Sequence, residues 1–189
     1  MLKKILLFVF SLVILFILTE CIAIAPLGEA GSLKKLIAAH GLHKKIYLHI
    51  SKKKQRLEVI CEDKIIKSYP AVFGFDPKND KLREGDGCTP EGNFHIRAKY
   101  PHKKWSKFIW LDYPNKESFE KIKKAKAEKR IPANAKPGGQ VGIHGVPKGL
   151  DVFVSMRCNW TKGCICLKTK DINDLYEAIP NDILIKIEP

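Results

Sequence analysis

The order of apolar and polar residues predicts a chain built mainly of short strands. Positions 46–50, 57–61 and 183–187 alternate between apolar and polar side chains, which is the period of a half-buried strand. Other short apolar runs, bounded by turn residues, predict more strands of the same kind. The complete set is 46–50, 57–61, 65–73, 93–99, 105–115 with its turn, 141–143, 152–154 and 183–187.

Three segments have helical spacing instead. Residues 32–41 predict a short packing helix, and residues 116–130, rich in Lys, Glu and Ala, predict an exposed basic helix. The apolar positions of the second helix are Phe119, Ile122 and Ala125. The last helix is expected to take Thr169 as its N-cap and to place Asp171 in its first turn, where a negative charge suits the helix dipole. Many strands with two or three helices indicate a mainly β fold.

The first 30 residues have the pattern of a targeting segment. Lys3 and Lys4 precede an apolar run at 5–18 that is broken only by Ser11. A cleaved signal, a lipoprotein signal at Cys21 and a retained membrane anchor all fit this pattern, so the three stay open. We expect an exported protein that meets the membrane only through this segment, and we divide the chain into residues 1–30, a helical lead-in at 31–44 and a main domain at 45–189.

The chain carries a large excess of positive charge. Among its 189 residues, 34 basic and 20 acidic side chains give a formal net charge of +14. A field of this sign favours acidic partners: an anionic wall polymer, an anionic membrane or nucleic acid. The sequence has no nucleic-acid-binding motif and does not interleave its basic residues with stacking aromatics, so we do not expect a nucleic-acid partner.

Two residues in the second half of the chain suggest nucleophilic chemistry. His144 precedes Gly145, and about twenty residues later Cys164 follows Gly163. A thiol is mostly protonated at neutral pH, so a nucleophilic cysteine needs a base nearby, and His144 is the candidate. Glycine lets the backbone come close, so the amides of Gly163 and Cys164 are candidate donors to an oxyanion.

The motifs around these residues resemble a known family. Ile143-His144-Gly145 is followed by Trp160-Thr161-Lys162-Gly163-Cys164-Ile165, and both are preceded by Thr89-Pro90-Glu91-Gly92 leading into a strand. In this order the motifs resemble the L,D-transpeptidase catalytic domain of the YkuD type, in the branch with a Trp-Thr-x-Gly-Cys nucleophile motif. The resemblance covers roughly Lys45 to Pro189.

This resemblance implies a β-sandwich and a cysteine enzyme of the cell wall. Cys164 would be the nucleophile and His144 the general base, with the backbone carbonyl of Gly145 orienting the imidazole and no cofactor or metal required. The implied substrates are peptidoglycan stem peptides, with a second stem or a wall-linked protein as acceptor. A monomer is expected.

Two alternatives to the transpeptidase stay open. One is a peptidoglycan hydrolase that forms the same acyl-enzyme on Cys164 and passes it to water. The other is a wall-binding module without catalysis. The sequence departs from the family at Cys166, where an arginine is frequent, and at Lys162, where a histidine is frequent, and these departures bear on the choice.

The remaining cysteines allow other chemistry. An exported protein can hold disulfides, and Cys61, Cys88, Cys158 and Cys166 could pair in several ways, with Cys158–Cys166 as one guess. The set Cys158, Cys164, Cys166 and His144 could also supply zinc ligands. Its spacing is not that of a zinc finger or ribbon, and a metal would quench the thiol, so no metal is expected.

Overall fold

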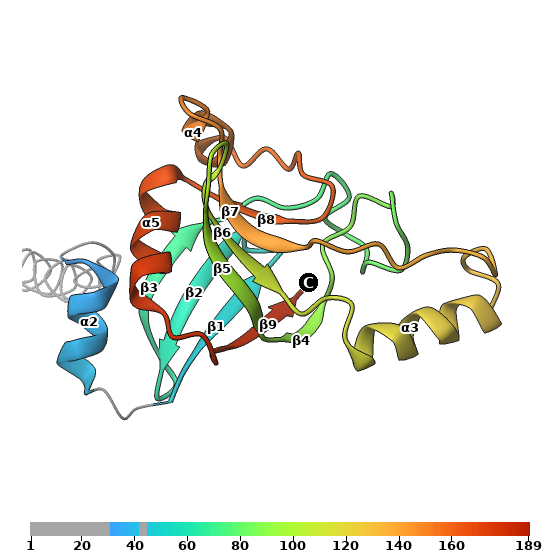
Figure 1. Cartoon of the computed structure of the whole chain (residues 1–189), viewed down its shortest axis with the longest axis horizontal. Coiled ribbons are helices and arrows are strands. Elements are labelled where there is room, and N and C mark those ends of the chain that lie inside the picture. Colours follow the sequence, from blue (N-terminus) through green and yellow to red (C-terminus); the bar gives the residue numbers. More distant parts are fainter. Residues whose placement is uncertain (1–30, 42–44) are drawn as a thin grey trace, which may run out of the picture.

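The computed structural model describes residues 31–41 and 45–189, and they form a mainly β fold with two mixed sheets. The first sheet has the order β3-β2-β1-β9-β4 and the second the order β5-β6-β7-β8 (Figure 1). The strands are β1 (Ile46–Ser51), β2 (Arg56–Cys61), β3 (Lys64–Pro70), β4 (Gly92–Phe94), β5 (Ile96–His102), β6 (Ser106–Leu111), β7 (Gly142–Gly145), β8 (Ile165–Leu167) and β9 (Leu184–Glu188).

The two sheets share one hydrophobic core, as expected for a sandwich. Leu48 and Ile185 come from the first sheet, and Ile109, Ile143 and Ile165 from the second, and all five are fully buried in one cluster. Strand β9 runs parallel to β1 and antiparallel to β4, so it joins the early hairpins to the middle of the chain. Burial of this apolar surface is the main stabilising term of the fold.

The second sheet carries the residues of interest. Strands β6 and β7 are antiparallel, whereas β7 and β8 are parallel, with Ile143 opposite Ile165 and His144 opposite Cys166. A parallel pair needs a crossover connection, and residues 146–164 provide it. This register brings His144 to the segment that carries Cys164, although the two lie far apart in the sequence.

Four helices lie among the described residues. They are α2 (Leu33–His40), α3 (Lys116–Ala127), α4 (Asp151–Ser155) and α5 (Thr169–Ala178). Helix α5 packs its buried Ile172 and Leu175 into the shared core, and α2 packs beside it through Leu33 and Ile37. Helix α3 projects away from the sheets, at the right of Figure 1. It buries Ile122 and Ala125 in a separate small cluster with Ile131.

Most of the predicted elements are confirmed, with some differences. Residues 152–154 form part of helix α4 rather than a strand, because Val152 and Phe153 are exposed and only Val154 turns inward. The predicted strand 93–99 is divided between β4 and β5, which belong to different sheets. The predicted strand 65–73 ends at Pro70 in the structure.

Two details of the helices also differ from expectation. Thr169 is the first residue of α5 rather than its N-cap, which is Lys168, while Asp171 does lie in the first turn. In α3, Phe119 is exposed instead of facing the core. The targeting segment lies outside the described residues. Within 31–41 and 45–189, no helix is long and apolar enough to cross a membrane.

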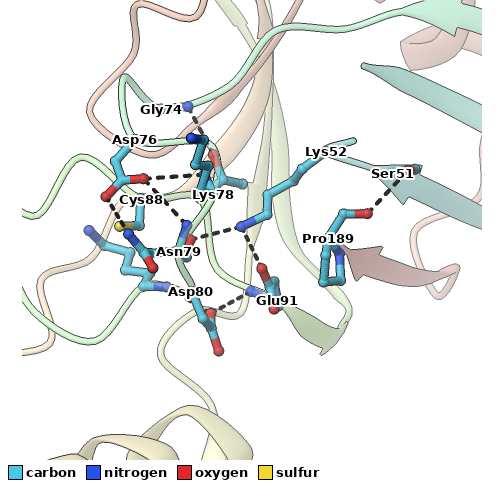
Figure 2. Close-up of polar contacts among 12 residues, drawn as sticks. Ser51, Lys52, Gly74, Asp76, Lys78, Asn79, Asp80, Cys88, Glu91 and Pro189 are labelled. Carbon is cyan, nitrogen blue, oxygen red and sulfur yellow. Dashed lines mark hydrogen bonds and ion pairs between the residues drawn. The ribbon is translucent and has the colours of Figure 1, made fainter. Parts of the chain in front are cut away.

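The long loop between β3 and β4 is held by polar contacts (Figure 2). The buried ammonium of Lys52 donates to the carbonyl oxygen of Asn79 at 2.8 Å and pairs with the carboxylate of Glu91. Asp80 accepts from the backbone N–H of Glu91 at 2.8 Å. Asp76 accepts from the side chain of Asn79 at 2.9 Å. These contacts fix the loop against β1, and its other side packs on the segment that carries Cys164.

Candidate active site

His144 lies on β7 with only 2% of its surface exposed. Its Nδ1 is 2.7 Å from the carbonyl oxygen of Gly145, so Nδ1 carries the proton and donates it, and Nε2 keeps a free lone pair. Burial lowers the pKa of His144 to about 4, although the bond to Gly145 works in the opposite direction and nearby His102 adds to the lowering. The imidazole is therefore neutral at neutral pH.

Aromatic rings fix the plane of this imidazole. Trp105 stacks on it with 4.4 Å between centroids and 23° between planes, and Phe108 lies nearly parallel at 6.0 Å. Trp160 meets its edge at 6.1 Å and 75°. His102 stacks on Trp105 with 4.4 Å between centroids. The rings of His102, Trp105 and His144 therefore form one stack beside the β5–β6 hairpin. This stack covers one face of the His144 imidazole and keeps water away from it.

Cys164 is half-buried at the entry to β8. Its thiol donates to the carbonyl oxygen of Gln140 at 3.6 Å. Burial raises the pKa of this thiol, while the backbone N–H of Gly142 and the charge of Lys81 act to lower it. With a neutral imidazole and a protonated thiol, the arrangement suits a base that removes the proton during attack rather than a preformed ion pair.

Gly163 is required by the packing of the loop before Cys164. Its φ is +135°, and a Cβ at this position would lie 2.6 Å from the carbonyl oxygen of Cys88. Its amide donates to Oγ1 of Thr161 at 3.1 Å, and that hydroxyl donates to the carbonyl oxygen of Cys164 at 2.7 Å. The expected oxyanion role of the Gly163 amide meets an obstacle here, because its hydrogen is already committed to Thr161.

A comparison with known families identifies the domain that carries these residues. Residues 45–187 match the YkuD family, described as the L,D-transpeptidase catalytic domain. The chain belongs to the L,D-transpeptidase catalytic domain family. The match spans the β7 histidine and the β8 cysteine loop. We found no match among the curated proteins.

Solved structures show the same fold at low identity. Bd1075 of Bdellovibrio bacteriovorus is 19% identical with a TM-score of 0.55, and covers 76% of this chain and 48% of its own. The helical cell shape determining protein Pgp2 of Campylobacter jejuni is 19% identical with a TM-score of 0.56. The match covers 82% of this chain and 55% of Pgp2. L,D-transpeptidase 3 of Mycobacterium tuberculosis, in complex with a faropenem-derived adduct, is 12% identical with a TM-score of 0.51. The match covers 77% of this chain and 61% of that protein. The chain thus spans about half the length of the first two proteins.

The two departures from the family motif have different surroundings. Cys166 is fully buried in a cluster with Val72, Val146 and Val154. Burial raises its pKa to about 12, helped by Cys164 and Asp151. Its sulfur is closed off from solvent, in contrast to the half-buried Cys164. Lys162, in contrast, is exposed.

The alternative cysteine chemistry is not seen in this L,D-transpeptidase domain. All five described cysteines are free thiols, so the guessed Cys158–Cys166 disulfide is wrong. The Cys166 sulfur lies in an apolar cluster, whereas that of Cys158 faces the carbonyl oxygen of Met156 at 3.8 Å. Within the described ranges, no three His, Cys, Asp or Glu side chains are placed to hold a metal ion.

Sequence reasoning singled out His144, Gly145, Gly163 and Cys164. The structure places the first two on β7 and the other two in the loop that leads into the neighbouring strand β8. Sequence reasoning missed the residues around them. Trp105 was not singled out, because it lies in the turn before β6 and no strand periodicity marks it. The charged residues of the loop at 74–92 were expected to form turns and internal salt bridges, and Lys81 and Asp86 do form such a pair, but the sequence did not show that Lys81 is buried beside Gly163. Thr161, which bonds both Gly163 and Cys164, stands in the motif itself.

Proposed function

We propose that this protein is an exported, cysteine-dependent L,D-transpeptidase that acts on peptidoglycan stem peptides through an acyl-enzyme on Cys164. One observation carries the proposal. His144 is held by Gly145 in the tautomer that leaves Nε2 unprotonated, and the β7–β8 register sets it beside the loop that ends in Cys164. Membership of the family supports the reaction class.

The steps follow from this geometry. The thiol turns from Gln140 and gives its proton to Nε2 of His144, and the sulfur attacks the acyl carbon of the peptide bond. The carbonyl electron pair moves onto oxygen, where the amide of Cys164 is the expected donor. When the tetrahedral intermediate collapses, the C–N bond breaks, the leaving amine takes the proton from the imidazolium and a thioester remains.

The second half of the reaction mirrors the first. An acceptor amine attacks the thioester, His144 takes its proton, and the sulfur leaves as the thiol after proton return. A stem-peptide amine gives a cross-link, an amine of a wall-linked protein gives an attached protein, and water gives hydrolysis. The bond to Gly145 keeps the imidazole in one orientation through both halves.

The test is the intact mass of the full-length protein in detergent after incubation with a disaccharide-tetrapeptide, with and without a tripeptide amine acceptor. We expect a transient adduct on Cys164 and a cross-linked product. Cys164→Ala should abolish both, whereas Cys158→Ala, a change at another incompletely buried thiol, should abolish neither. Loss of the terminal residue without a cross-link, at excess acceptor, would favour the hydrolase. No adduct and no product would favour the binding module.

A further inference from the structure

Lys81 is a buried lysine with no role in the mechanism above. Only 5% of its surface is exposed. Burial of an ammonium group is costly unless the charge is paired and hydrogen-bonded, so a lysine in this position needs a physical reason. It lies in the β3–β4 loop, which packs under the segment that carries Cys164.

Asp86 holds the Lys81 ammonium in place. Nζ is 2.8 Å from Oδ1 of Asp86 and 3.2 Å from the carbonyl oxygen of Arg83. The carboxylate also accepts from the backbone N–H groups of Leu82, Arg83 and Cys88 at 2.9, 2.9 and 3.1 Å. Burial works against its ionisation, but Lys81 and these amides lower the pKa of Asp86 below its usual range. The Asp86 carboxylate is therefore favoured in its ionised form, and its contacts fix the position of the Lys81 ammonium.

The ammonium lies directly behind the nucleophile loop. A Cβ placed on Gly163 would be 3.7 Å from Nζ of Lys81, and Cys164 is the next residue. No atom of Asp86 is among the three atoms nearest that Cβ, so the ammonium is the closer of the two charged groups. The pair is thus a fixed dipole with its positive end toward Gly163 and Cys164.

We propose that Lys81 is a charge-stabilising residue of the site, whose ammonium, held by Asp86 behind Gly163, stabilises the negative charge that forms on the Cys164 sulfur. It acts through space and does not touch substrate. The inference rests on the proposed function only in taking Cys164 as the nucleophile. Burial raises the pKa of Cys164, and the charge of Lys81 acts to lower it, which is the direction that this proposal requires.

The other groups around Cys164 do not supply this charge. His144, on β7, is neutral at neutral pH because its pKa is lowered to about 4. Cys166, on β8, and Cys88, in the β3–β4 loop, stay protonated because burial raises the pKa of each to about 12. Lys162, beside the nucleophile, is exposed, so water and salt screen it. Lys81 is the buried cation of this group.

The experiment measures the rate of Cys164 alkylation by iodoacetamide against pH, in the full-length protein, with the modified peptide identified by mass. Lys81→Met should raise the pKa of Cys164 by about one unit and slow alkylation at pH 7 about tenfold. Lys52→Met is the matched control. Lys52 is 3% exposed and paired with Glu91 in the same loop network (Figure 2). None of its atoms is among the three nearest a Cβ on Gly163. Its profile should match the wild type.

The alkylation needs no peptidoglycan, so its result stands apart from the test of the proposed function. A folded Lys81→Met protein, judged by circular dichroism, with an unchanged profile would overturn the inference. If that variant does not fold, the salt dependence of alkylation in the wild type still tests the inference. The effect of a buried ammonium is nearly insensitive to salt, so the pKa of Cys164 should stay constant between 0.1 and 1 M NaCl, roughly a threefold change in Debye length. A rise of the pKa with salt would assign the effect to surface lysines and reject Lys81.

Discussion

The indole of Trp105 covers one face of the His144 imidazole, with 4.4 Å between ring centroids. The backbone of the same tryptophan accepts the N–H of Gly145 at 3.1 Å. One residue therefore both shields the imidazole and holds the glycine whose carbonyl orients it. The hairpin between β5 and β6 is part of the site, although it carries no group that reacts.

Replacing Trp105 by leucine should make the base more basic and less well placed. Water would reach the imidazole, so the pKa of His144 should rise by about one unit toward its ordinary value. We expect the acid limb of the pH profile of kcat/KM to move up by the same amount. Trp110→Leu, which changes a half-buried indole on β6, is the control and should leave the limb in place. An unmoved limb in Trp105→Leu would show that the indole does not shield the base.

The pH dependence of the wild type follows from the lowered pKa of His144. The base works only when neutral, and its pKa is lowered to about 4, so kcat/KM should fall below about pH 4 and stay flat from pH 5 to 7. A limb near 6.5 would mean that the imidazole is solvated in the working enzyme. The profile is measured with the disaccharide-tetrapeptide under single-turnover conditions.

The same lowered pKa affects stability. The folded state binds fewer protons at His144 than the unfolded chain, so this residue's contribution is fully present above pH 6.5 and is lost as the pH falls toward 4. The loss should reach about 3 kcal/mol in the free energy of unfolding. Urea unfolding at pH 7 and pH 4 measures it. His144→Gln should lose less stability over this range, because it removes the buried titrating group.

Gly163→Ala should disrupt the nucleophile loop. The new methyl group would meet the carbonyl oxygen of Cys88 at 2.6 Å, and a φ of +135° is itself strained for alanine. We expect a loss of about 2 kcal/mol or more in unfolding free energy together with loss of acyl-enzyme formation. Gly149→Ala separates the two causes, since that glycine has a φ of +83° and no neighbour within 4 Å. It should lose about 1 kcal/mol and keep its activity. Equal losses in both variants would exclude the clash as the cause.

Cys166→Ala should cost stability but not chemistry. The sulfur fills space among Val72, Val146 and Val154, and its removal leaves a small cavity worth about 1 kcal/mol. Acyl-enzyme formation on Cys164 should persist within a factor of about three, since the thiol has no access to substrate. Intact mass before and after incubation with substrate measures this. Failure of Cys166→Ala to form the adduct, while still folded, would give Cys166 a direct role.

The sequence predicted the helices and strands whose apolar residues recur at a regular spacing. Alternation at 46–50 and 57–61 predicted β1 and β2, and the apolar stripe after Thr169 predicted α5. It failed at residues 152–154, because three apolar residues in a row satisfy a strand and one helical turn equally well. It also joined β4 to β5, since nothing local marks His95 as the point where the chain changes sheets.

The site shows the same division. His144 and Cys164 could be named as candidates because a motif carries them, and the glycines beside them mark close backbone approach. Lys81 was not predictable, because its role depends on the β3–β4 loop folding under Gly163, a contact between residues far apart in the sequence. The commitment of the Gly163 amide to Thr161 was likewise invisible, since it depends on the turn geometry of the folded loop.

The position of β9 has a consequence for when the site becomes competent. This strand lies between β1 and β4, and its Ile185 and Ile187 sit in the core shared with the sheet that carries His144. All of the groups proposed to react precede β9 in the chain. The hydrophobic core beneath them is complete only when β9 has packed against it. A chain ended before Leu184 would contain every residue of the mechanism and still lack an organised site. Removal of β9 is therefore expected to disorganise the site although it removes none of the residues proposed to react.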